Sequence, residues 1–138
     1  STPGKTLLVN HFLINDSWYL VDLPGYGYAK ISQTARVRLH KMINEFINDS
    51  QEMVLLFVLL DSRHDIQKID LEFLMSLGAA GIPFSIIFTK SDKLGKAAYK
   101  KRLLEDWEEL PPVFVTSSEK NSGREEVLEY IQTILNTL

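Results

Sequence analysis

The hydrophobic pattern of the chain begins with two β-rich runs, at residues 6–16 and 17–25. The residues where these runs meet, Asn15, Asp16 and Ser17, favour a tight turn. Two such runs joined by a short turn predict a β-hairpin.

Two later apolar runs lack the alternation of a half-exposed strand. They cover residues 53–60 and 83–88 and are too short for buried helices. Runs of this kind are typical of strands covered on both faces, as in a parallel sheet. A further strand is predicted at residues 112–116.

Amphipathic helices are predicted after the hairpin and around the later strands. Apolar residues recur at helical spacing over residues 33–49 and 69–77, and roughly over 96–108. A last helix is expected to begin at a capping box, Ser-Gly-Arg-Glu at residues 122–125. Strands that alternate with helices in this way predict an α/β fold with a doubly wound, mostly parallel sheet.

Composition narrows the class of protein further. The 138 residues carry a net charge of −3, so the chain has no overall positive field and a nucleic-acid partner would need a local patch. The absence of cysteine excludes disulfides, thiolate metal sites and cysteine nucleophiles. No apolar run approaches the roughly 20 residues that cross a bilayer. We expect one domain over residues 1–138, monomeric, cytoplasmic and without membrane contact.

Polar residues follow the predicted strands, where ligands bind in sheets of this kind. The first set is Asp22, Leu23, Pro24 and Gly25. An aspartate at a strand end can hold Mg²⁺ through a water, and a glycine offers its N–H to a phosphate. A strand-ending turn is the alternative interpretation of this segment.

The second set is Thr89, Lys90, Ser91 and Asp92, directly after the run at 83–88. The Asp92 carboxylate could accept hydrogen bonds from N1–H and the exocyclic amine of guanine, which adenine does not offer in that arrangement. The aliphatic stem of Lys90 could cover the base. A surface lysine followed by a helix cap is the alternative.

Weaker signals come from the loop Thr116, Ser117 and Ser118 and from the start of the chain. A backbone N–H of the loop could reach guanine O6, although serine and threonine after a strand often form only a loop. The hydroxyl of Thr6 is an oxygen donor suited to Mg²⁺, and an ordinary flexible terminus is the alternative. The strand-end sets together have the order and the position that a guanine-nucleotide site requires.

The segments STPGKT, DLPGYGYAK, DSRH, TKSDK and TSSEKNSG, taken in order, resemble the EngB family of ribosome-assembly GTPases over nearly the whole chain. TKSD in place of the commoner NKxD, and the aromatic DLPGYGYAK segment, favour this family over translation factors or small signalling GTPases. The resemblance implies a P-loop GTPase (G-domain) fold, binding of GTP and GDP with Mg²⁺, and slow hydrolysis. It also implies a role in assembling the large ribosomal subunit, linked to cell division and septation.

The resemblance also assigns the site. Asp22 to Gly25 would face the γ-phosphate, and Thr6 and Asp22 would serve Mg²⁺. The first switch would comprise Gly4, Lys5, Thr6, Leu7 and Leu8. The guanine-binding residues would be Thr89, Lys90, Ser91, Asp92, Thr116, Ser117 and Ser118.

The catalytic residue is not identified by the sequence. Many GTPases place a water-orienting glutamine where this chain has Tyr26. Asp61, Arg63 and His64 end a strand and fit a structural loop network better than a catalytic cluster. Basic residues at 36, 38 and 41 could meet ribosomal RNA, although a solvated helix face explains them as well.

No GxxxxGK[ST] phosphate loop occurs in the sequence, and Lys5-Thr6 is no substitute because no strand precedes it. We therefore expect an upstream segment of roughly 40 to 60 residues, the size of a strand-loop-helix unit with a leader. Its strand would lie between those ending at Asp22 and Asp61, and a stable fold without it is doubtful.

Two other classes remain open. One is a ribosome-binding module that acts independently of nucleotide, with a defunct GTPase site. The other is a receiver-like domain that uses Asp22 or Asp61 as phosphoacceptor, in which TKSD and TSS would share no purpose.

Overall fold

The computed structural model describes residues 9–23, 32–62, 66–90 and 111–138. The chain divides into two compact units, Ser1–Met53 and Val54–Leu138, which we call the hairpin unit and the sheet unit. The predicted helix at 96–108 lies outside the described residues.

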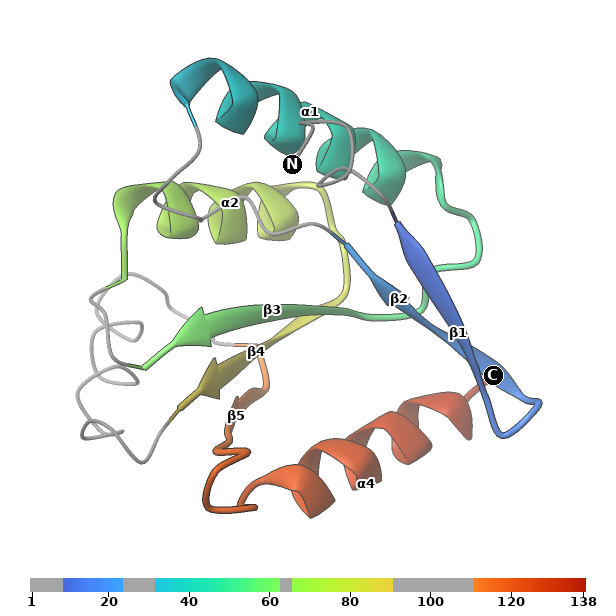
Figure 1. The fold of residues 1–138 in the computed structure, drawn as a ribbon. Helices are drawn as coiled ribbons and strands as arrows, with labels where there is room; N and C mark the ends of the chain where they lie inside the picture. Colours follow the sequence, from blue (N-terminus) through green and yellow to red (C-terminus); the bar gives the residue numbers. More distant parts are fainter. Residues whose placement is uncertain (1–8, 24–31, 63–65, 91–110) are drawn as a thin grey trace. The chain divides into compact units, whose positions relative to one another are not determined.

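The hairpin unit contains the predicted hairpin. Strands β1 (Asn10–Ile14) and β2 (Trp18–Asp22) are antiparallel, with Ile14 opposite Trp18 (Figure 1). The N–H of Ser17 donates to the Ile14 carbonyl at 2.9 Å and closes the turn. Asn15 and Asp16 have φ of 51° and 54°, a region that Asn and Asp tolerate better than other side chains.

Helix α1 spans Gln33–Asp49, the range that the apolar spacing predicts. It begins where the Ser32 hydroxyl accepts a hydrogen bond from the N–H of Ala35 at 3.1 Å, an N-cap that satisfies one free donor of the first turn. Leu39, Ile43 and Ile47 are buried, so one stripe of the helix is its packed face.

The sheet unit contains three parallel strands in the order β3-β4-β5. They are β3 (Leu56–Asp61), β4 (Phe84–Thr89) and β5 (Val113–Val115). Asp61 lies opposite Thr89, and Phe88 opposite Val115. The prediction of parallel strands is confirmed.

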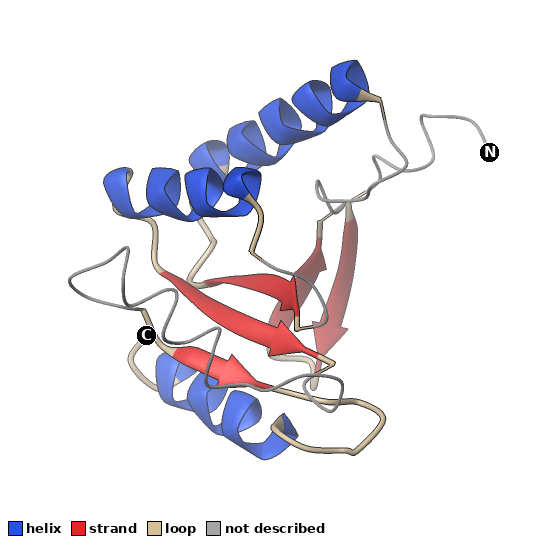
Figure 2. Ribbon diagram, turned by 90° about the vertical axis from the view of Figure 1, so that its left-hand side faces the viewer, coloured by secondary structure: helices blue, strands red, loops and turns tan. Residues whose placement is uncertain are grey.

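Helices α2 (Lys68–Ala79) and α4 (Arg124–Leu135) lie on opposite faces of this sheet (Figures 1 and 2). Because side chains alternate along a strand, Val58 and Leu60 share one face with their register partners Ile86 and Phe88. That face and α2 supply most of the buried hydrophobic side chains of the unit: Val58, Leu60, Phe73, Leu74, Leu77, Ile86 and Phe88.

The other face carries an aromatic row that joins the sheet to α4. The ring of Phe114 lies 5.2 Å from that of Tyr130 on α4 and 6.5 Å from that of Phe57 on β3, centroid to centroid. Such pairs add about 0.5–1.5 kcal/mol beyond the area that they bury. The row therefore holds α4 against the sheet.

The start of α4 differs from the prediction. Its N-cap is Gly123 at φ 82°, and no side chain caps it, so the predicted capping box at residues 122–125 is wrong. A Cβ at Gly123 would fall on the Val115 carbonyl oxygen and lie 2.9 Å from the Thr116 Cα. This close approach, rather than a side-chain cap, decides how the helix begins.

A reciprocal cap that the sequence did not suggest lies at α2, where the Asp70 carboxylate accepts a hydrogen bond from the Gln67 N–H at 3.1 Å.

Among the described residues, no helix has both the length and the apolar character to cross a membrane.

Four strands have an edge without a partner within the described part of the chain, and β2 and β3 are the two that bear on the prediction. There β2 pairs only with β1, and β3 pairs only with β4. The expected strand between β2 and β3 stays a prediction.

Candidate functional site

The carboxyl ends of β3, β4 and β5 meet at one edge of the sheet because the strands are parallel (Figure 1). Two of the predicted site segments leave the sheet there, Thr89 and Lys90 after β4 and the loop at residues 116–118 after β5. Asp61, which the sequence assigned to a structural loop, ends β3 at the same edge. In open α/β sheets this edge is where ligands bind.

Hydrogen bonds beyond the ladder fasten these strand ends. The N–H of Ser62 donates to the Thr89 carbonyl at 2.8 Å, and the N–H of Thr116 donates to the Phe88 carbonyl at 2.8 Å. The hydroxyl groups of Thr89 and Thr116 donate to carbonyls of the preceding strands at 3.4 and 3.3 Å. The two predicted guanine loops therefore start from fixed, neighbouring points.

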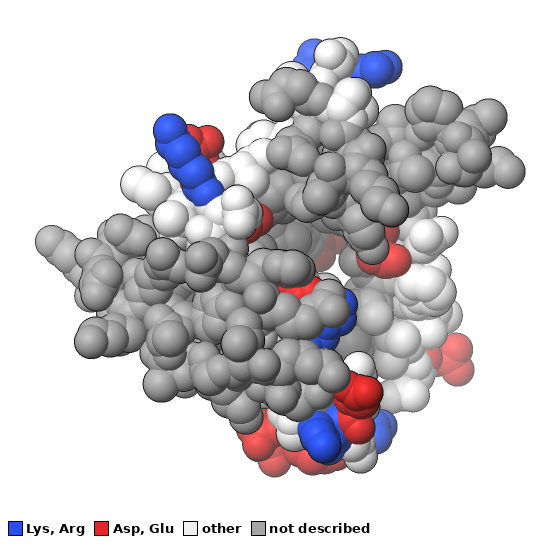
Figure 3. Space-filling view, turned by 60° about the vertical axis from the view of Figure 1, so that its left-hand side comes forward, with Lys and Arg blue, Asp and Glu red and all other residues white. Residues whose placement is uncertain are grey.

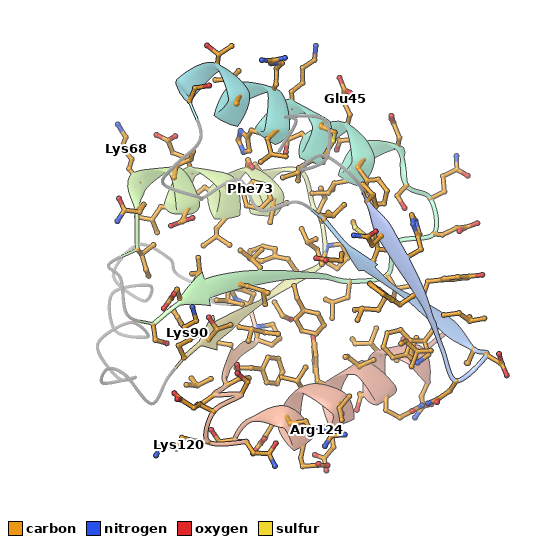
Figure 4. All side chains as sticks on the ribbon, viewed as in Figure 1. Glu45, Lys68, Phe73, Lys90, Lys120 and Arg124 are labelled. Carbon is orange, nitrogen blue, oxygen red and sulfur yellow. The ribbon has the colours of Figure 1, made fainter. Side chains whose placement is uncertain are left out.

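Lys90 extends from this edge in an unusual backbone conformation. Its φ is 55°, in the left-handed region that side chains other than Asn and Asp seldom adopt. Its Nζ lies 3.2 Å from Oδ2 of Asp61, at the end of the adjacent strand. Figure 4 shows Lys90 at the carboxyl ends of β3 and β4.

The sequence placed Asp61 in a loop network with Arg63 and His64, both outside the described residues. Its ion pair with Lys90 was missed, because 29 residues separate the two and nothing local joins them. Only the parallel pairing of their strands brings Asp61 next to a predicted base-binding residue.

The loop after β5 is built around a buried serine. Ser117 is 2% exposed, and its backbone pairs with that of Ser122 through hydrogen bonds of 3.1 and 3.0 Å. Its hydroxyl accepts from the N–H of Lys120 at 3.1 Å. Ser117 therefore shapes the loop, and Ser118, the next residue, is exposed.

One predicted site residue with clear chemistry is described in the hairpin unit. Asp22 is the last residue of β2, pairs with Asn10 and is exposed. Leu23 follows it and is partly buried. The remaining predicted site residues lie outside the described residues: Gly4, Lys5, Thr6, Leu7, Leu8, Pro24, Gly25, Ser91 and Asp92.

The donors present suit a Mg²⁺ ion that is held mainly by its ligand. Across the described ranges, no group of three or more His, Asp or Glu side chains could form a metal cage. Mg²⁺ beside phosphates commonly uses one or two protein oxygens and keeps several waters. The exposed carboxylate of Asp22 at a strand end fits that role.

Basic and acidic side chains lie next to one another at several places on the face that Figure 3 draws. On α1, Lys41 pairs with Glu45 at 3.9 Å, which accords with the solvated helix face considered for the basic residues there.

The sequence matches a class of GTP-hydrolysing proteins. Residues 1–90 match the family model described as 50S ribosome-binding GTPase. A probable GTP-binding protein EngB of Porphyromonas gingivalis is 59% identical, over 96% of this chain and 69% of the relative. The namesake of Phocaeicola vulgatus is 57% identical, over 100% and 72%. The chain belongs to the EngB family.

Solved structures support the fold. A crystal structure of a probable GTP-binding protein engB has a TM-score of 0.80 at 18% identity, over 98% of this chain and 86% of that one. Aquifex aeolicus Era bound to GDP.AlF4- has a TM-score of 0.67 at 16% identity, over 91% and 43%. The chain has a P-loop GTPase-like α/β fold, with a three-stranded parallel sheet and a small antiparallel pair.

Proposed function

We propose that the protein binds GTP and GDP with Mg²⁺, hydrolyses GTP slowly and acts as a switch in assembly of the large ribosomal subunit. The observation that carries the proposal is the pair of loops at one sheet edge, Thr89-Lys90 after β4 and 116–118 after β5. Membership of the EngB family gives these loops a shared purpose, the recognition of guanine.

Each guanine-binding residue has a distinct part in the proposal. The Asp92 carboxylate accepts from N1–H and the exocyclic amine of the base. The methylene stem of Lys90 covers one face of the ring. The N–H of Ser118 donates to O6, while Ser117 holds the loop and Thr89 fastens the strand end.

The phosphate side uses the two segments that lead into and out of the hairpin. Gly4, Lys5, Thr6, Leu7 and Leu8 form a switch, and Asp22, Leu23, Pro24 and Gly25 face the γ-phosphate. Thr6 and Asp22 serve the Mg²⁺ ion, which neutralises charge on the phosphate oxygens when bound.

The partner in this proposal is the large ribosomal subunit or its precursor, and the nucleotide state controls docking on it. Failure of that step links the protein to cell division and septation. We expect the protein to be cytoplasmic, since the cytoplasm is where ribosomes assemble in this proposal. We also expect it to be a monomer.

The substitution Asp92→Asn tests base recognition in the full-length protein. Because an amide can no longer accept both hydrogen bonds, affinity for GDP should fall by about 10- to 100-fold, the value of one or two bonds to a charged group. Affinity for xanthosine diphosphate should rise, since its base offers a carbonyl where guanine has the amine. Calorimetric titration with both nucleotides measures the change.

Glu72→Gln is a control for the lost negative charge, because Glu72 is an exposed residue of α2 and its carboxylate pairs with Lys68 of the same helix at 3.8 Å. It should leave both affinities unchanged. A guanine preference that survives Asp92→Asn would remove the assignment of Asp92.

A further inference from the structure

An ion pair joins the ends of two strands at the proposed base site. Nζ of Lys90 lies 3.2 Å from Oδ2 of Asp61, and the carboxylate comes from β3, not from the loop that carries the lysine. Asp61 is opposite Thr89 in the sheet register, and the next residue, Ser62, donates its N–H to the Thr89 carbonyl at 2.8 Å. The carboxylate is therefore held at a fixed place at the end of the strand next to β4.

The backbone of Lys90 points to a use for its side chain. A φ of 55° places the Cβ of a lysine against a carbonyl oxygen, whereas asparagine or glycine would adopt this conformation more readily. Left-handed residues that are not glycine cluster at ligand sites, because surrounding structure must hold them there. At Lys90 the sheet ladder holds the residue before it and Asp61 holds the ammonium.

The exposure of the pair argues against stability as its main purpose. The Lys90 side chain is 50% exposed and that of Asp61 26% exposed. Exposed pairs contribute little to folding, since water and salt screen them. A lysine held by an ion pair has fewer accessible rotamers, so less side-chain entropy is lost when a ligand packs on it.

We infer that Asp61 is a positioning residue for the nucleotide base. It holds the ammonium of Lys90, and so keeps the four-carbon stem extended at the sheet edge as an apolar surface for one face of the purine ring. Asp61 does not touch the base in this arrangement. The inference rests on the proposed guanine site and adds a residue to it.

The test measures GDP affinity of the full-length protein by calorimetry. Asp61→Asn should raise the Kd by about two- to fivefold, the range for an ion pair of this exposure. Asp61→Glu should restore most of the affinity because it keeps the anion. Lys90→Met, which keeps a stem without a charge, should raise the Kd by a similar factor.

The double variant decides whether Asp61 acts through Lys90. In the Lys90→Met background, Asp61→Asn should cause no further rise in Kd, because no ammonium remains to be held. The ratio of GDP to inosine diphosphate affinity should stay constant in Asp61→Asn, since contacts at the base edge are unchanged. Glu72→Gln, which removes the same charge from the exposed pair with Lys68, should bind GDP as the wild type does.

Three results would overturn the inference. The first is an unchanged Kd for GDP in Asp61→Asn. The second is a rise in Kd on adding Asp61→Asn to Lys90→Met that equals the rise caused by Asp61→Asn in the wild type. The third is a rise in Kd in Asp61→Asn that is accompanied by a loss of thermal stability of the nucleotide-free variant. An ion pair with a purely structural role would give that result. If the wild type binds no GDP, the proposed function fails as well. If Lys90→Met raises the Kd for GDP but Asp61→Asn does not, this inference alone fails.

Discussion

Two buried serines of the sheet unit differ in what their hydroxyl groups bind. Ser85, on β4, is fully buried on the face that carries Phe57 and Phe114, and its Oγ has no hydrogen-bond partner among the described residues. Ser117 is equally buried, but its Oγ accepts from the N–H of Lys120 at 3.1 Å. A buried hydroxyl without a partner lowers stability, and a bonded one raises it.

Ser85→Ala should therefore raise the free energy of unfolding by about 1 kcal/mol, and Ser117→Ala should lower it by about 1 kcal/mol. Each variant lacks one oxygen atom relative to the wild type, and urea unfolding measures the free energy of unfolding of both. Equal losses in both would mean that the Ser85 hydroxyl contributes a bond to the folded state.

At the scale of the element, the entry into α4 depends on one glycine. Gly123 has a φ of 82°, and a Cβ added to it would meet the carbonyl of Val115, the last residue of β5, and Thr116 directly after it. Because Thr116 and Ser117 belong to the proposed guanine loop, this contact couples the start of the helix to the shape of the site. The capping-box pattern Ser-Gly-Arg-Glu fits the local sequence, but the contact with β5 determines the geometry.

Gly123→Ala should lower the free energy of unfolding by about 2 to 4 kcal/mol, from left-handed strain plus overlap with backbone atoms. Gly81→Ala is a matched control, since Gly81 has a φ of 70° but open space around the added methyl. It should cost only about 1 to 2 kcal/mol. Similar losses in both variants, measured by urea unfolding, would contradict the account of the α4 entry.

Elements whose pattern is local were predicted well. The apolar spacing that predicts α1 lies within the helix itself, and the structure gives the same range, Gln33–Asp49. The hairpin turn is fixed by Asn15 and Asp16, which tolerate a positive φ. Within the described residues, its pairing runs from Asn10 opposite Asp22 to Ile14 opposite Trp18.

Features that depend on distant residues were missed. The Asp61–Lys90 pair requires knowledge that β3 and β4 are adjacent and in register, which no single segment contains. The cap at Gly123 likewise depends on the position of β5. Predictions for Asp92, Thr6 and the other site residues outside the described ranges stay predictions.

At the scale of the whole molecule, the doubly covered parallel sheet explains where a ligand would bind. Helices α2 and α4 cover its two faces, so the strand ends are the positions where polar loops can meet without disturbing the core. Membership of the EngB family agrees with this arrangement. The net charge of −3 means that any contact with ribosomal RNA would depend on local basic residues and not on the overall field.

The most direct test of the account is titration of the full-length wild-type protein with GDP, GTP and ADP in the presence of Mg²⁺. The account predicts saturable binding of GDP and GTP, and at least about 100-fold weaker binding of ADP, since a site built to bond the guanine edge leaves polar groups unpaired beside adenine. Equal affinities for ADP and GDP, or no binding of either guanine nucleotide, would contradict it and favour a module that contacts the ribosome independently of nucleotide.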